Sequence, residues 1–117
     1  MVRAAAAVGP IATFSTKLID FGHVAVGSSI SRSVTLTNTG DRPLQVSRTT
    51  LLWADEVAVT DDSCAGRTLA PRQRCSVTLT YSPTKDGMLA PFPQLGFVDN
   101  APGYGGGQVV ELRGDTE

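Results

Sequence analysis

Residues 30–39 alternate between apolar and polar side chains with a period of two. Ile30, Val34 and Leu36 fall on one side of an extended chain, and five hydroxyl residues fall on the other: Ser31, Ser33, Thr35, Thr37 and Thr39. A helix would scatter both sets around its circumference. The segment therefore predicts a half-buried β-strand. Asn38 and Gly40 stand where this strand must turn, and both residue types tolerate left-handed backbone.

The same pattern returns at residues 75–83. The side chains predicted to face inward are Cys75, Val77, Leu79 and Tyr81; hydroxyl residues alternate with them, and Pro83 ends the segment. Two strands of this kind, each with one apolar and one hydroxyl face, favour two antiparallel sheets packed face to face.

Shorter strand candidates occupy most of the remaining chain. They are residues 17–22, 23–27, 44–47, 56–60, 95–98 and 108–113, separated by turn residues. Pro91 and Pro93 would remove hydrogen-bond donors from a central strand, so we expect an edge, a bend or a bulge across residues 88–95. About seven strands without an amphipathic helix predict an all-β, immunoglobulin-like antiparallel β-sandwich.

A length of 117 residues fits one domain with a single core. We expect an N-terminal arm at 1–14, the sandwich at 15–114 and a C-terminal tail at 115–117. The formal net charge is -1 and Lys and Arg form no run, which argues against a nucleic-acid partner. No stretch approaches the ~20 apolar residues that span a bilayer, so membrane insertion is not expected.

Cys64 and Cys75 stand on either side of a turn-rich segment at 65–71. No further ligand is placed to complete a metal site with them, because His23 is far away in sequence and no CxxC motif occurs. A disulfide is the favoured interpretation, and such a bond persists outside the cytosol. The alternative is a pair of reduced cysteines, one of them in the core.

The sequence contains few residues that could form a catalytic site. His23 is the single histidine and is interpreted as a surface or packing residue, not as a general base. The acidic pairs at 55–56 and 61–62 show no regular oxygen-ligand spacing and are interpreted as solvated turns. The tripeptide Arg113-Gly114-Asp115, which some integrin ligands use, fits the end of the last strand and is interpreted as a coincidence. We therefore expect no enzyme activity, no cofactor and no metal.

Several short motifs follow one another in a fixed order. They are residues 18–22 (LIDFG), 34–40 (VTLTNTG), Cys64, residues 69–71 (LAP), Cys75 and residues 77–83 (VTLTYSP). Together they resemble the ASH or hydin-type (choice-of-anchor D-like) immunoglobulin module. The resemblance implies a seven-stranded sandwich related to the major-sperm-protein and PapD-like folds. Similar modules in bacteria commonly belong to extracellular proteins and frequently carry this cysteine pair.

These observations favour a non-enzymatic structural or adhesive module that docks onto a protein assembly. The partner would be an assembly lattice or a surface protein, and the chain would be a virion decoration or accessory protein or a bacterial surface component. Its location would be extracellular, on a cell surface or on a virion. The expected interface residues are aromatic side chains outside the regular strands, namely Phe92, Trp53 and Tyr104.

Carbohydrate binding by a module of an extracellular protein is the alternative function. It predicts exposed aromatic residues beside carboxylates, for instance Trp53 with Asp55 and Tyr104 with Asp99. A cytoskeletal scaffold, as in ciliary and centrosomal modules of the family, agrees less well with a cysteine pair that favours an oxidising compartment.

Overall fold

The computed structural model describes residues 9–52, 54, 56–84, 93–101 and 107–116. These residues form nine strands: β1 (Ala12–Phe14), β2 (Leu18–His23), β3 (Ile30–Asn38), β4 (Leu44–Leu52), β5 (Val57–Asp62), β6 (Thr68–Leu69), β7 (Arg74–Tyr81), β8 (Gln94–Asp99) and β9 (Gly107–Asp115). No helix occurs in the part of the chain that the structure describes.

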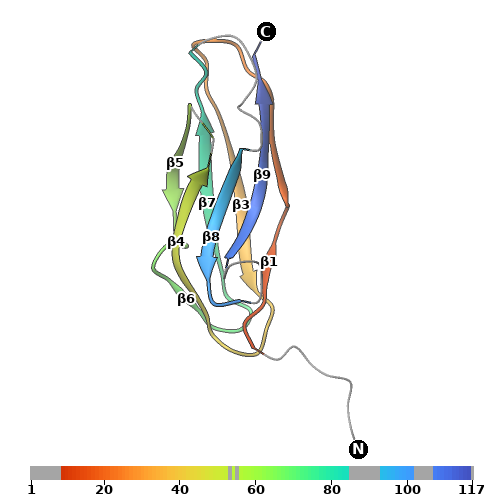
Figure 1. The fold of residues 1–117 in the computed structure, drawn as a ribbon, viewed down its shortest axis with the longest axis vertical. Helices are drawn as coiled ribbons and strands as arrows, with labels where there is room; N and C mark the ends of the chain where they lie inside the picture. Colours follow the sequence, from red (N-terminus) through yellow and green to blue (C-terminus); the bar gives the residue numbers. More distant parts are fainter. Residues whose placement is uncertain (1–8, 53, 55, 85–92, 102–106, 117) are drawn as a thin grey trace, which may run out of the picture.

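The strands form two sheets that pack face to face (Figure 1). One sheet has the order β1-β3-β7-β5, and the other has the order β2-β9-β8-β4-β6. The predicted all-β sandwich is therefore confirmed. The count exceeds seven because two of the strands are very short: β1 has three residues and β6 has two.

The predicted inward and outward positions of the two alternating strands are confirmed. β3 and β7 pair along their whole length, with Val34 opposite Val77 and Leu36 opposite Cys75. The exposed fractions of Val34 and Leu36 are 1% and 0%, and Val77 and Leu79 are both at 0%. Leucine, valine and phenylalanine from both sheets complete a single core, as expected from a sequence poor in aromatic residues.

Among the described strand pairs of this antiparallel sandwich, one pairing in the second sheet is parallel. The chain leaves the first sheet after β1, and β2 then runs alongside β9 in the same direction. This pairing starts where the Glu111 amide donates to the Lys17 carbonyl at 2.9 Å. It shifts register between Asp20 and His23, where Gly22 has a φ of 73° that suits glycine.

The sandwich extends beyond both expected boundaries, residues 15 and 114. Residues 12–14, expected in the arm, form β1 and pair with residues 36–38 of β3. Phe14 explains why this short segment is held, because its ring lies 4.9 Å from the ring of Phe97 in the opposite sheet. Asp115, expected in the tail, ends β9, and its carbonyl accepts a hydrogen bond from the Val24 amide at 2.9 Å.

Asn38 and Gly40 end β3 for a reason other than left-handed backbone, because neither has a positive φ. Asn38 is completely buried and its side chain links neighbouring segments. Gly40 is required by close approach: a Cβ atom there would lie 2.0 Å from the Gly9 carbonyl oxygen and 2.7 Å from the Ile11 amide nitrogen. The segment that leads into β1 therefore crosses directly over Gly40.

Part of the segment expected to be irregular belongs to a regular, internal strand. β8 begins at Gln94, immediately after the buried Pro93, and lies between β9 and β4. The Pro93 carbonyl still accepts a hydrogen bond from the Leu112 amide at 3.0 Å, although proline itself has no donor. Pro91 lies outside the described residues.

Candidate docking surface

The three aromatic residues predicted to form an interface, Phe92, Trp53 and Tyr104, lie outside the described residues. Asp55, predicted to stand beside Trp53 in a sugar site, lies outside them as well. Asp99, the carboxylate predicted to accompany Tyr104, is described and is 7% exposed. It is therefore a buried residue at the end of β8, which corrects its expected place on a sugar-binding surface.

Cys64 and Cys75 form a disulfide in the structure. Their sulfur atoms are 2.10 Å apart and their Cα atoms are 5.1 Å apart. Cys64 is 0% exposed and Cys75 is 4% exposed, and both belong to the core. The bond attaches the segment that follows β5 to strand β7 inside the core, so its role is structural.

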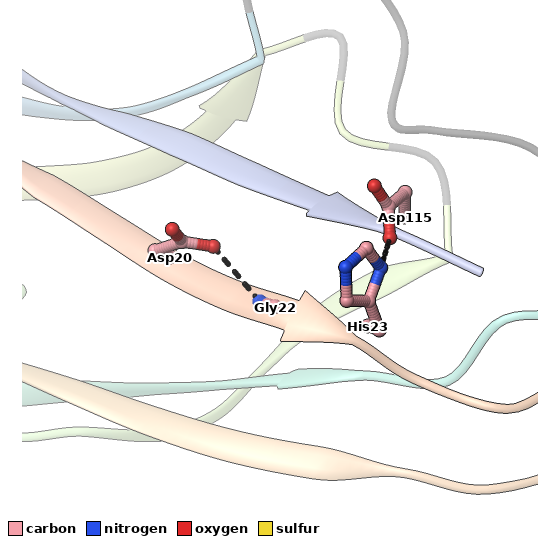
Figure 2. A network of polar contacts seen from close by, with 4 residues as sticks. All are labelled: Asp20, Gly22, His23 and Asp115. Atoms are coloured by element: carbon pink, nitrogen blue, oxygen red, sulfur yellow. Dashed lines mark hydrogen bonds and ion pairs between the residues drawn. The ribbon is translucent and has the colours of Figure 1, made fainter. Parts of the chain in front are cut away.

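His23 and Asp115 form an ion pair at the ends of β2 and β9 (Figure 2). Figure 2 also shows the Asp20 carboxylate accepting a hydrogen bond from the Gly22 amide, at 2.8 Å. Both side chains of the ion pair are substantially exposed, and the pair joins two strand ends. This exposed position at the strand ends agrees with a surface role for His23.

The Arg113-Gly114-Asp115 tripeptide lies within β9. A Cβ atom on Gly114 would come within 3.2 Å of both Phe21 and Tyr81, so the middle of the motif packs on the core. Arg113 lies opposite Asp20 on β2, 4.0 Å away. A sheet position of this kind does not present the tripeptide as a protruding loop.

The acidic pair at 61–62, expected in a solvated turn, instead ends β5, and the Asp62 carboxylate bonds within the protein. Asp62 accepts hydrogen bonds from the Cys64 and Ala65 amides at 2.7 and 3.0 Å, and from the Thr49 hydroxyl at 2.6 Å. The last of these contacts joins β5 of one sheet to β4 of the other. Within the described ranges, no group of three or more His, Cys, Asp or Glu side chains is placed to hold a metal ion.

Two buried groups have shifted acidities. Burial raises the pKa of Tyr81, and the nearby charges of Glu56 and Asp115 add to this increase. Burial also raises the pKa of Asp99, partly offset by the Ala101 amide that donates to it at 3.0 Å and by the Gln108 side chain. Both groups lie within the sandwich, so these shifts concern stability.

The outer surface of the first sheet is covered by hydroxyl groups. We call it the hydroxyl face, and its members on β3 and β7 are Ser31, Ser33, Thr35, Thr37, Ser76, Thr78 and Thr80. Cross-strand partners bond to each other: the Ser31 and Thr80 hydroxyl oxygens are 2.8 Å apart, and those of Ser33 and Thr78 are 2.7 Å apart. A shallow depression of about 340 Å³ at one end is lined by Thr35, Ser63, Arg74, Cys75 and Ser76.

The outer surface of the second sheet combines apolar and charged side chains. We call it the mixed face, and its members by strand register are Leu18, Asp20, Arg48, Thr50, Leu52, Gln94, Gly96, Val98, Val109, Glu111 and Arg113. Leu18 and Val109 are 37% and 39% exposed, high values for large apolar residues. At the centre is Gly96, which has Thr50 and Val109 as its neighbours on β4 and β9.

The open edges of β2 and β3 are less suitable docking sites, because local side chains bond to them. Along β2, the Thr16 hydroxyl bonds both the amide and the carbonyl of Leu18, at 3.2 and 2.8 Å. Along β3, the Thr35 amide donates to the Ser15 hydroxyl at 2.9 Å and the Arg32 guanidinium donates to the Ser31 carbonyl at 3.0 Å. Such contacts compete with the addition of a further strand.

The mixed face was missed at the sequence level. Its members come from four strands. Three of them, β9, β8 and β4, become neighbours only when the sheet forms. The single available signal was the alternation in Gln108–Arg113, which places Val109 on the same side of the strand as Glu111 and Arg113.

Comparison with known proteins identifies the module. Residues 8–102 match the family model described as ASH, for abnormal spindle-like microcephaly-associated, ASPM-SPD-2-Hydin. No curated protein is significantly similar in sequence. In the described residues, no helix has the length and hydropathy needed to cross a membrane.

Solved structures share the fold at low sequence identity. The secreted serine protease VesC from Vibrio cholerae is 22% identical with a TM-score of 0.66, over 93% of this chain and 23% of that protein. The Vibrio cholerae protease VesB is 21% identical with a TM-score of 0.63, over 91% and 31%. The ASH/PapD-like domain 7 of human CEP192 is 16% identical with a TM-score of 0.64, over 100% and 97%. This chain thus spans less than a third of the two proteases.

Proposed function

This chain belongs to the ASH family, and from that membership we propose that it is a non-catalytic module that docks onto a protein partner outside the cytosol. The observation that carries the proposal is the mixed face, where exposed Leu18 and Val109 flank the charged Glu111 on a β-sheet. Apolar anchors within a polar rim are the usual composition of a protein interface.

Two observations support a location outside the cytosol. The buried Cys64–Cys75 disulfide is a bond that cytosolic reductants disfavour. The same fold also accounts for 23% and 31% of two Vibrio cholerae proteases, one of them described as secreted. In our proposal the module serves as an accessory to other protein components. In one form of this proposal, the chain is a virion decoration protein or a bacterial surface component, and its partner is a repeated lattice.

Site-specific photo-crosslinking tests the docking function. A benzophenone amino acid replaces Val109 on the mixed face in one variant and Thr78 on the hydroxyl face in a control variant. Both proteins are exposed to the extracellular and cell-envelope fractions of the native source, illuminated and analysed by mass spectrometry. We expect covalent protein adducts at position 109 and few at position 78. Equal yields at both positions, or no adducts at either, would contradict docking by the mixed face.

Carbohydrate binding is the second candidate, favoured by the hydroxyl face. Its paired Ser and Thr side chains present an uncharged array, and the depression at one end adds the Arg74 guanidinium. Polysaccharides offer complementary hydroxyl groups. A glycan array probed with the wild-type chain and with Ser33→Ala/Thr78→Ala tests this function: specific signals that the double substitution abolishes would support it, and a silent array would exclude it.

A further inference from the structure

We infer that the mixed face binds a second copy of this chain, with Glu111 of each copy against Arg48 of the other. The inference rests on the proposed docking function and names the partner. It starts from two charged residues on this face, Glu111 on β9 and Arg48 on β4. Neither forms a salt bridge within the described part of the chain, whereas Arg113 lies 4.0 Å from Asp20. The face therefore offers one positive and one negative side chain to a partner.

The positions of these two charges are symmetric about the centre of the face. Glu111 lies opposite Gln94, and Arg48 lies opposite Val98 on the other side of β8. Gly96 is midway between Gln94 and Val98 along β8. With strands ~4.8 Å apart and a rise of ~3.3 Å per residue, Glu111 and Arg48 are separated by roughly 16 Å with Gly96 at the midpoint.

This arrangement is self-complementary. Consider a two-fold axis that lies between two facing copies, passes over Gly96 and is perpendicular to the line from Glu111 to Arg48. Such an axis brings Glu111 of each copy over Arg48 of the other, so two opposite-charge contacts form at once. An isologous dimer needs one surface that matches itself in this way.

The centre of the face is a buried glycine, which presents no side chain that would hold a partner away. Gly96 has no side chain, and the nearest atom to a Cβ built there is Thr50 Cγ2 at 3.4 Å. The exposed side chain of Val109 lies beside this low point on β9, and the exposed side chain of Leu18 lies farther out on β2, opposite Glu111. Burying them supplies the apolar part of the contact, while Glu111 and Arg48 set its orientation.

The size of the face indicates a weak dimer. Four strands and about six residues of strand length cover roughly 15 by 20 Å. A standard interface buries about 800 Å² on each partner, and this surface is smaller. Pairing is therefore concentration-dependent and becomes effective where copies are held near one another, as on a lattice or a cell surface.

Charge reversal tests the inference. Sedimentation equilibrium of the full chain is measured from about 10 µM to about 1 mM, a range that covers weak association. We expect wild type to form dimers and Glu111→Arg and Arg48→Glu each to weaken dimerisation about tenfold or more, because each creates two like-charge contacts. An equimolar mixture of the two variants, and the double variant Glu111→Arg/Arg48→Glu, should recover dimerisation to within about threefold of wild type.

A matched control is Arg74→Glu, which makes the same charge change on the other sheet. It should dimerise like wild type, and circular dichroism should show the same fold for all variants. Wild type that stays monomeric at the highest concentration overturns the inference, as does a mixture that fails to recover. If a chain that is monomeric throughout still gives protein adducts from position 109, the inference fails while the proposed docking function stands.

Discussion

The side-chain amide of Asn38 donates a hydrogen bond to the carbonyl of Leu69 at 2.9 Å, joining residues 31 positions apart in the chain. The same amide donates to the Arg42 carbonyl at 2.7 Å, and its oxygen accepts from the Gly40 amide at 2.9 Å. With an exposed fraction of 0%, Asn38 is a buried polar residue with its hydrogen-bonding capacity used. It holds the β3–β4 turn against β6.

Asn38→Ala should destabilise the domain by about 3 kcal/mol, because it leaves buried carbonyl and amide groups without partners. Urea denaturation followed by circular dichroism measures this change in the free energy of unfolding. Thr39→Ala is a suitable control: Thr39 is exposed and its hydroxyl bonds only that of Thr13, at 2.8 Å. We expect the control to cost about 0.5 kcal/mol or less. Similar losses for both variants would contradict the linking role of Asn38.

Gly40→Ala should be destabilising by about 2 kcal/mol or more, through overpacking. The new Cβ atom would lie 2.0 Å from the Gly9 carbonyl oxygen, a backbone atom that must move with the segment entering β1. Amide exchange measured by NMR should therefore accelerate mainly in residues 11–14 and in the facing part of β3.

Gly27→Ala separates this effect from backbone strain. Gly27 has a φ of 90° but nothing within 4 Å of a built Cβ atom. The substitution should cost about 1 kcal/mol, without selective exchange in β1. If Gly40→Ala is neutral, or if its exchange pattern matches that of Gly27→Ala, close approach is not the reason for glycine at position 40.

Removing the disulfide with Cys64→Ala/Cys75→Ala should lower the free energy of unfolding by about 3 kcal/mol, the chain-entropy value for a loop of this length. The cysteines are 11 positions apart and buried. Mass spectrometry after alkylation of the denatured protein without reductant should show no added groups. Two added groups under those conditions would show that the cysteines are reduced.

Much of the fold could be predicted from the sequence because its strongest signals are local. The alternation in residues 30–39 and 75–81 correctly gave the buried positions of β3 and β7. Three consecutive residues are too few to show a period, so β1 was placed in the arm. Parallel pairing of β2 with β9 could not be predicted either, because it depends on where the chain changes sheets, not on either strand alone.

The candidate docking surface depends on register, and local pattern does not specify register between distant strands. Glu111 and Arg48 become related only when β8 separates them with Gly96 in the middle. Prolines at 91 and 93 had also argued against an internal strand, whereas β8 starts just beyond them. The available sequence signal for an interface was the presence of aromatic residues in loops, and this signal favoured the loops over the sheet.

Asp99→Asn should make the domain more stable at pH 7. Because burial raises the folded-state pKa of Asp99, its ionised form is disfavoured in the folded protein. Its contribution therefore favours folding below the unfolded-state pKa and is lost as the pH rises through the folded-state pKa. Asparagine keeps an oxygen that can accept from the Ala101 amide but does not ionise. Urea denaturation of both proteins from pH 3 to pH 7 should show the variant's advantage growing with pH; an advantage that shrinks with rising pH would contradict the assignment.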